Sequence, residues 1–165
     1  IARAVAAIGR ALGMKIIAHR RQPGRSADDG TECVSLDDLF ARSDVVSLHC
    51  PLAGETAGLV NARRLALMKP TATLVNIARG GIVDDAALIN ALKAGQIAAA
   101  GVDVFENEPA FNQEFLTCKN VVLTPHIASA SEPTRRAMAN CAADNLIAAL
   151  SGKTPPNLLN PESAQ

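Results

Sequence analysis

Short apolar runs alternate with amphipathic segments along the chain. The runs consist mainly of β-branched and aliphatic residues, as do strands buried in a parallel sheet. Five runs are predicted to be strands, at residues 14–18, 44–49, 72–77, 97–104 and 120–124. Apolar residues at helical spacing, together with capping residues, predict helices at residues 1–12, 35–40, 61–69, 86–95 and 133–152.

The first and the last predicted helix each carry an apolar face. The two faces consist of Ile1, Val5, Ile8 and Leu12 in the first helix and Met138, Ala142, Leu146 and Ala149 in the last. Between the first two predicted strands, residues 20–31 are polar and contain Pro23, Gly24 and Gly30, which predicts a loop. The tail from Thr154 is rich in proline and is predicted to be a linker or a docking segment.

Strands separated by helices predict an α/β fold with a doubly wound, Rossmann-like parallel sheet that is covered on both faces. Ligands of such sheets bind beyond the carboxyl ends of the strands. We therefore expect the chemistry to lie in the segments that follow the predicted strands. These segments are residues 19–21, 49–51, 78–81, 103–108 and 125–126.

Composition and charge narrow the function classes. Apolar residues make up 48% of the 165 residues, which is enough to form a core. The 16 basic and 16 acidic residues cancel, so the sequence predicts no nucleic-acid partner and no anionic membrane partner. The absence of Trp and Tyr argues against a protein that binds single strands by stacking. No apolar stretch reaches the ~18 residues that a membrane span needs, and no signal peptide is evident.

Four cysteines are scattered along the chain without metal-ligand spacing. A disulfide framework and a zinc site are the functional alternatives. The sequence favours reduced thiols that pack as small apolar groups, no metal site and a cytoplasmic location. The four residues are Cys33, Cys50, Cys118 and Cys141.

Four segments carry a recognisable combination of motifs. They are SLHCPL at 47–52, VNIARGGIVD at 75–84, GVDVFENEP at 101–109 and TPHIA at 124–128. In this order and spacing, they resemble the D-isomer-specific 2-hydroxyacid dehydrogenases over nearly the whole chain, to about Leu150. Within that family the chain looks most like the reductases that act on glyoxylate, hydroxypyruvate or 2-ketogluconate.

The resemblance implies a catalytic set of Arg79, Glu108 and His126. An arginine can hold the carboxylate of a 2-oxo acid and polarise its carbonyl group. A histidine beside a carboxylate can supply the proton that the carbonyl oxygen needs when hydride arrives from a nicotinamide. The implied enzyme is an NAD(P)-dependent oxidoreductase that acts on CH–OH donors.

The start of the chain departs from the family pattern. Ile1 and Ala2 match the end of the glycine-rich dinucleotide fingerprint, and the first strand and the leading glycines are missing. We expect residues 1–150 to form a truncated NAD(P)-binding domain, with residues 151–165 returning toward an absent substrate domain. Because the first strand of this fold is central, we also expect a split sheet.

Arg20 and Arg21 follow the first predicted strand, where an NAD-specific member places an acidic residue. Two guanidinium groups would favour a ribose phosphate, so the sequence predicts NADP(H) in preference to NAD(H), which stays possible. The alternative is a solvated basic turn without influence on cofactor choice.

The resemblance implies further cofactor contacts. They come from Ile1, His49, Cys50, Pro51, Thr56, Ile77, Ala78, Asp103, Ala128 and Ser129, with Arg79 and His126 also touching the cofactor. His49 could instead be a strand-end histidine that bonds backbone, and Asp103 could be a simple cap.

Other functions remain open at this stage. Some relatives of this fold act as nucleotide-binding corepressors, and a truncated, inactive fragment is a further alternative. Oxidation of formate or phosphite would use the same cofactor domain. The resemblance also implies a homodimer.

Overall fold

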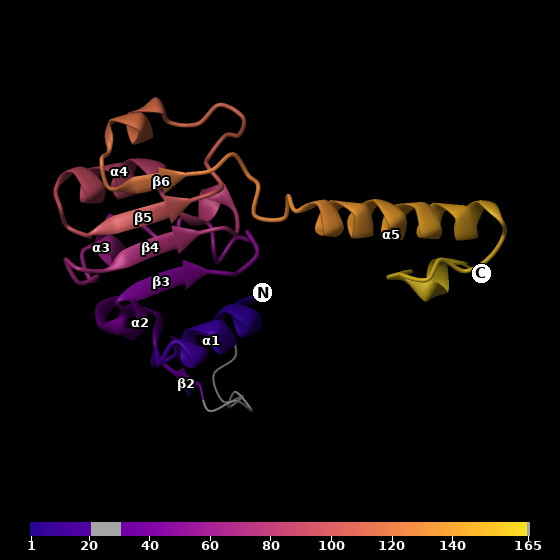
Figure 1. The fold of residues 1–165 in the computed structure, drawn as a ribbon, viewed down its shortest axis with the longest axis horizontal. Helices are drawn as coiled ribbons and strands as arrows, with labels where there is room; N and C mark the ends of the chain where they lie inside the picture. The colour runs from indigo at the N-terminus through magenta and orange to yellow at the C-terminus, as the bar shows by residue number, and fades with distance from the viewer. Residues whose placement is uncertain (21–30, 165) are drawn as a thin grey trace. The chain divides into compact units, whose positions relative to one another are not determined.

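The computed structural model describes residues 1–20 and 31–164, and the chain divides into two compact units that meet in sequence at His126 and Ile127. The first unit contains two parallel sheets, one of four strands and one of two (Figure 1). The larger sheet has the order β3 (Val45–Leu48), β4 (Thr73–Asn76), β5 (Ala99–Val102), β6 (Val121–Leu123). The smaller sheet pairs β1 (Ile17–Ala18) with β2 (Glu32–Cys33). The α/β class, the parallel strands and the split sheet are all as predicted.

The five predicted strands are all present, although each is shorter than its apolar run. The structure adds one strand that the sequence does not predict, β2, because two residues without an apolar run give no signal. The prediction that a helix separates each pair of consecutive strands is wrong for β5 and β6. The structured element between them is a short 3₁₀ segment, η2 (Gln113–Thr117).

Alternate residues on the strands of the larger sheet point into one core. Leu74 of β4 pairs with Val46 on one side and Ala100 on the other, and all three are buried. The same hydrophobic cluster includes residues of three helices. These helices are α2 (Leu36–Arg42), α3 (Ala62–Leu65) and α4 (Asp85–Lys93). They therefore cover one face of this sheet.

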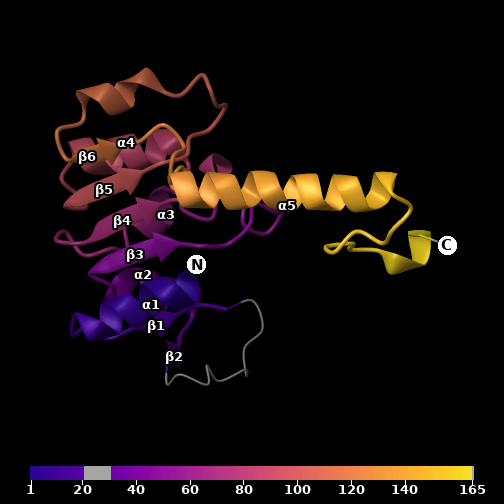
Figure 2. The ribbon, with the colours of Figure 1, turned by 45° about the vertical axis from the view of Figure 1, so that its right-hand side comes forward.

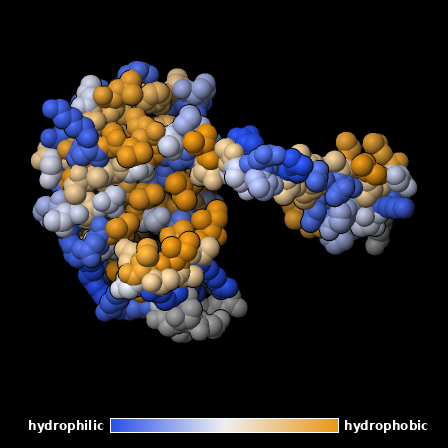
Figure 3. Space-filling model, viewed as in Figure 1, coloured by the Kyte–Doolittle hydropathy of each residue, from blue (hydrophilic) through white to orange (hydrophobic). Residues whose placement is uncertain are grey.

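The opposite face of the larger sheet is only half-buried. Val45 is 45% exposed and Val122 is 68% exposed. Figure 3 shows hydrophobic residues gathered over the sheet on the side turned to the viewer. Covering on both faces is therefore wrong for the described part of the first unit.

The helix α1 (Ala2–Ala11) forms where the sequence predicts it, but its apolar face stays in solvent. Ile8 is 63% exposed and Leu12 is 75% exposed, while Gly9 is the one buried residue of the helix. An added Cβ on Gly9 would lie 3.0 Å from the Ile16 side chain, so the helix contacts the chain just before β1 closely there. Because its apolar residues stay exposed, α1 does not supply a second covering layer.

The second unit consists of α5 (Glu132–Leu150) and the tail. Ser131 caps the helix by accepting a hydrogen bond from the Thr134 amide, and Pro133 lies in its first turn, as predicted. No residue of this helix is buried, so the apolar residues that the sequence places on one face of it stay accessible to solvent. The chain reverses after α5 (Figure 2), where Asn157 and Asn145 exchange two hydrogen bonds.

In the part of the chain that the structure describes, no helix is both long and apolar enough to cross a membrane. The four cysteines are free. The prediction that the cysteines pack as small apolar groups is correct for Cys50 and Cys118, which contact the core. It is wrong for Cys33 and Cys141, which are exposed.

Candidate active site

Glu108 and His126 form a direct hydrogen bond at the carboxyl ends of two neighbouring strands. Glu108 lies in the loop after β5 and His126 follows β6, and His126 Nδ1 is 2.7 Å from Glu108 Oε2. Adjacent parallel strands end at the same edge of a sheet, which explains the encounter of two residues 18 positions apart. The structure thus brings together two of the three predicted catalytic residues.

The carboxylate of Glu108 is held at both oxygens. Its Oε1 accepts the backbone N–H of Phe105 at 2.8 Å, while Oε2 faces His126. The hydrogen bond with His126, and after it the Phe105 amide, lower the pKa of Glu108 below its ordinary value. Because an ionised carboxylate can only accept, His126 donates from Nδ1 and keeps Nε2 for another partner.

The backbone of His126 has an unusual conformation. Its φ is 53°, in the left-handed region that residues with a side chain rarely adopt. The His126 N–H donates to the Asp103 carbonyl at 2.9 Å, which ties the loop after β6 to the end of β5. Asn107, next to Glu108, also has a positive φ, of 60°. Strained backbone on both sides of a polar pair is typical of functional sites.

Arg79 lies at the end of β4 in a turn that a buried asparagine organises. Asn76 is 1% exposed; its Nδ2 donates to the Arg79 carbonyl at 3.0 Å and its Oδ1 accepts the Ala78 amide at 3.1 Å. The Arg79 side chain is exposed, and its Nη1 donates to the Ala78 carbonyl at 2.6 Å. Among the described residues, it makes no hydrogen bond with Glu108 or His126.

Gly80 brings the turn that contains Arg79 (the Arg79 turn) against the loop after β5 that contains Glu108 (the Glu108 loop). An ideal Cβ added at Gly80 would lie 1.9 Å from the Phe105 carbonyl oxygen, a distance that no side chain can tolerate. The two backbones therefore touch only because residue 80 is glycine. Arg79 and Glu108 flank this contact, at one and three residues from it.

The polar residues after β3 make mostly local contacts. His49 Nε2 lies 2.9 Å from Ser47 Oγ, and burial lowers the pKa of His49. Burial also raises the pKa of the Cys50 thiol. Thr56 fastens the exposed loop that begins at Pro51, because its hydroxyl donates to the Pro51 carbonyl at 2.7 Å and accepts the Ala53 amide at 2.8 Å.

Asp103 is buried, and its Oδ1 accepts the Thr124 hydroxyl at 2.5 Å. This bond holds the ends of β5 and β6 together beneath the Glu108–His126 pair. Ile77 and Ala78 are half-buried, and Ala128 and Ser129 are exposed residues of the second unit. The cofactor contacts assigned to these residues stay predictions.

The first turn of α1 has the features of an anion site. This turn contains no acidic residue that would repel an anion. The N–H groups of such a turn favour a phosphate. The residues present therefore fit the pyrophosphate of a dinucleotide.

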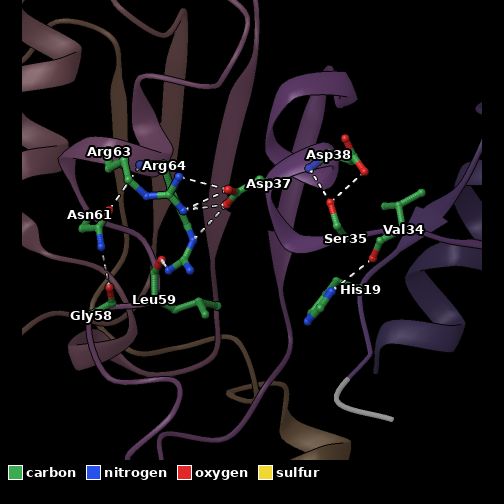
Figure 4. A network of polar contacts seen from close by, with 10 residues as sticks. All are labelled: His19, Val34, Ser35, Asp37, Asp38, Gly58, Leu59, Asn61, Arg63 and Arg64. Carbon is green, nitrogen blue, oxygen red and sulfur yellow. Dashed lines mark hydrogen bonds and ion pairs between the residues drawn. The ribbon is translucent and has the colours of Figure 1, made fainter. Parts of the chain in front are cut away.

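Arg20 lies two residues after the end of β1 and is half-buried, whereas Arg21 lies outside the described residues. The neighbouring His19 places its Nδ1 3.1 Å from the Val34 carbonyl, so the end of β1 is tied to the segment after β2 (Figure 4). This contact places Arg20 near the carboxyl ends of both strands of the smaller sheet.

Figure 4 also shows an ion-pair network that joins α2 to α3. Arg63 donates from both terminal nitrogens to Asp37, at 2.9 and 2.7 Å, and Arg64 Nε lies 3.7 Å from the same carboxylate. The hydrogen bonds from Arg63 lower the pKa of Asp37. Bidentate arginine pairs have a defined geometry, so this network fixes two helices that precede β3 and β4.

Sequence reasoning missed Asn76, Gly80 and Asp85 as residues that organise the site. Asn76 gave one usable signal, an amide at the end of an otherwise apolar strand. Asp85 directly precedes the predicted helix at residues 86–95, and nothing in the sequence indicates that its carboxylate accepts the Glu106 amide in the Glu108 loop.

Comparison with known proteins gives a consistent result. Residues 1–128 match the family described as D-isomer specific 2-hydroxyacid dehydrogenase, NAD binding domain. A glyoxylate reductase of Aeropyrum pernix is 53% identical over 161 residues, which cover 96% of this chain and 48% of that protein. The chain thus spans about half the length of the curated relatives that it matches.

Solved structures give the same picture. A protein of Thermus thermophilus superposes with a TM-score of 0.88 at 43% identity, over 95% of this chain and 50% of that one. An NADPH-dependent glyoxylate/hydroxypyruvate reductase of Sinorhizobium meliloti, in complex with NADP and malonate, gives a TM-score of 0.83 at 40% identity, over 90% of this chain and 46% of that one.

Proposed function

Because the chain belongs to the D-isomer specific 2-hydroxyacid dehydrogenase family, as its NAD-binding domain, we propose that the full-length protein transfers hydride between NADP(H) and a small 2-oxo or 2-hydroxy acid. We place the substrate in the class of glyoxylate, hydroxypyruvate and 2-ketogluconate. The hydrogen bond of 2.7 Å between Glu108 and His126 carries the proposal. A protein that only senses a nucleotide has no need of such a proton donor.

His126 is the proton donor in the direction of reduction. Glu108 accepts from Nδ1, which fixes the orientation of the imidazole and leaves Nε2 to face the substrate oxygen. The lowered pKa of Glu108 keeps this carboxylate ionised at neutral pH, where it stabilises the protonated ring. In the reverse direction the same nitrogen accepts the proton of the hydroxyl group.

Arg79 binds the substrate carboxylate. Its side chain is exposed at the carboxyl end of β4, beside the Glu108 loop. A guanidinium has five N–H donors, so the bond to Ala78 leaves donors for a planar carboxylate. Because a guanidinium pairs with a carboxylate, this role of Arg79 predicts that the substrate is an acid. When bound, the nicotinamide supplies or takes up the hydride at the substrate carbon.

The first turn of α1 would hold the pyrophosphate, and Arg20 with Arg21 would hold a ribose phosphate. The fit rests on the N–H groups of the first turn of α1, which contains no acidic residue, and on the half-buried arginine after β1. The similarity to the NADPH-dependent reductase of Sinorhizobium meliloti supports the preference for NADP(H). A homodimer and a cytoplasmic location, both implied by the resemblance, remain part of the proposal.

The test compares NADPH with NADH in the full-length protein, with glyoxylate and hydroxypyruvate as substrates. We expect turnover with both acids and a kcat/KM for NADPH at least about tenfold above that for NADH, which corresponds to about 1.4 kcal/mol. Arg20→Glu should reverse this preference, because a carboxylate repels the ribose phosphate and accepts from a ribose hydroxyl.

Two results would contradict parts of the proposal. A wild-type preference for NADH would remove the role of Arg20 and leave the reductase intact. Tight nucleotide binding without turnover of any small 2-oxo acid would instead favour the regulatory, corepressor-like alternative.

A further inference from the structure

Asp85 links the start of α4 to the loop that carries Glu108. It is the first residue of the helix and is 3% exposed. Its Oδ2 accepts the backbone N–H of Glu106 at 3.1 Å, across 21 positions of sequence. The buried carboxyl group of Asp85 thus links two segments that both border the candidate active site.

Helix α4 does not need this carboxylate for its own cap. The preceding residue, Asp84, is the N-cap, and its Oδ1 accepts the Ala87 amide at 2.9 Å. The Asp85 side chain instead bonds outside its helix. Burial of a carboxyl group is costly, and here burial, together with the charges of Glu106 and Asp84, raises the pKa of Asp85 to about 6.

The Glu108 loop is held at three consecutive backbone groups. The Phe105 carbonyl rests against Gly80, the Phe105 amide donates to Glu108 Oε1, and the Glu106 amide donates to Asp85. Two of these contacts are made from the segment that follows β4, which also carries Arg79. Asp85 supplies the contact nearest in sequence to Glu108.

One side of this loop borders open space. An open cavity of about 290 Å³ lies beside it, lined by Asp85, Glu106, Asn107 and Phe111 among others. Asn107 has a φ of 60°, so the backbone between Glu106 and Glu108 is in a conformation that its surroundings must impose. The Phe105 ring packs against Phe111 and Phe115, with ring centroids 5.1 and 5.8 Å away, while the backbone beside the cavity is held by the hydrogen bond from the Glu106 amide to Asp85.

We propose that Asp85 is a positioning residue, which fixes the Glu106 amide and thereby keeps the Glu108 carboxylate against His126. The inference rests on the proposed function only in regarding Glu108 and His126 as a proton-transfer pair. The positioning itself is a property of the folded chain and can be measured without substrate or turnover.

The first experiment compares Asp85→Ala with Asp85→Asn, which keeps an oxygen that can accept the Glu106 N–H. Asp44→Ala is the control, because Asp44 is an exposed aspartate bonded to Lys69. In Asp85→Ala we expect hydrogen exchange at the Glu106 amide to accelerate at least about tenfold relative to wild type. The pKa of the Glu108 carboxyl, followed by NMR, should rise toward its ordinary value. Asp85→Asn and the control should leave both readouts near wild type.

The second experiment follows the full-length protein in turnover. We expect Asp85→Ala to lower kcat at least about tenfold with little change in the Kd for NADPH, and Asp85→Asn to restore most of the activity. If Asp85→Ala does not fold, Asp85→Ser, whose hydroxyl is too short to reach Glu106, replaces it.

An unchanged pKa of Glu108 and unchanged exchange at Glu106 in a folded Asp85→Ala variant would overturn the inference. If faster exchange at the Glu106 amide and a raised pKa of Glu108 also appear in Asp85→Asn, the charge of Asp85, and not its acceptor oxygen, positions the loop, which contradicts the inference as well. A wild-type protein that turns over no 2-oxo acid would refute the proposed function but leave the two NMR readouts to decide the role of Asp85.

Discussion

The carboxyl groups of Glu108 and Asp85 are fastened to the same loop, but their surroundings move their pKa values in opposite directions. Hydrogen bonds from His126 and the Phe105 amide lower the pKa of Glu108. Burial raises the pKa of Asp85 to about 6 in spite of the bond from the Glu106 amide. Glu108 therefore favours folding in its charged form, whereas Asp85 opposes folding in its charged form.

Asp85→Asn should be more stable than wild type at neutral pH. An unfolded aspartate has a pKa near ~3.9, so between about pH 4 and pH 6 the folded chain binds more protons at Asp85, and its stability falls as pH rises. The variant lacks this loss. Its advantage in the free energy of unfolding should grow by about 2–3 kcal/mol between pH 4 and pH 7, as measured by urea titrations.

Asp44→Asn controls for the loss of one carboxyl group at an exposed position. A difference between Asp85→Asn and wild type that stays constant over the same pH range would show that Asp85 does not titrate as its burial predicts.

Two neighbouring glycines make contrasting contacts at the element level, where η1 (Gly80–Ile82) joins β4 to α4. A Cβ at Gly80 would collide with the Phe105 backbone at 1.9 Å, while a Cβ at Gly81 would meet the Leu52 methyl groups at 3.5 and 3.6 Å, in ordinary contact. Space at the first glycine thus controls how closely the Arg79 turn and the Glu108 loop approach each other.

Gly80→Ala should lower the free energy of unfolding by about 3 kcal/mol or more, since one backbone must move. Gly81→Ala is the matched control and should cost less than about 1 kcal/mol. Thermal unfolding of the two variants measures the difference. Equal stability of the two variants would mean that the backbones can separate without cost, and the close approach would lose its significance for the site.

The elements that the sequence predicts well are those with strong local signals. Asn61 and Asp84 cap the helices that the sequence predicts from residues 61 and 86, accepting the Arg64 amide at 3.2 Å and the Ala87 amide at 2.9 Å. The two-residue strand β2 and the 3₁₀ segment η2 escaped prediction because neither is long enough to show a period. The amphipathic pattern of α1 predicts the helix correctly but does not say what covers its apolar face, which is exposed here.

At the scale of the whole molecule, the residues of the candidate active site come from segments that are distant from one another in sequence. Motif resemblance named Glu108 and His126, and the parallel pairing of β5 and β6 explains their contact. No local pattern indicates that Asp85 bonds the Glu106 amide 21 positions away, because long-range contacts depend on the order of strands and on loop conformation. The chain's match to about half the length of its relatives leaves the substrate to be tested in the full-length protein.

The most direct test of the account is the turnover of His126→Gln in the full-length protein, measured with glyoxylate and NADPH. Glu108→Gln is the second arm, and Glu114→Gln, an exposed glutamate bonded to Lys93, is the control. The account predicts that kcat falls about 10²–10⁴-fold in His126→Gln, with the Kd for NADPH within about threefold of wild type. The kcat of Glu108→Gln should lie between that of His126→Gln and that of wild type. Turnover of His126→Gln within about threefold of wild type would contradict the assignment of His126 as the proton donor.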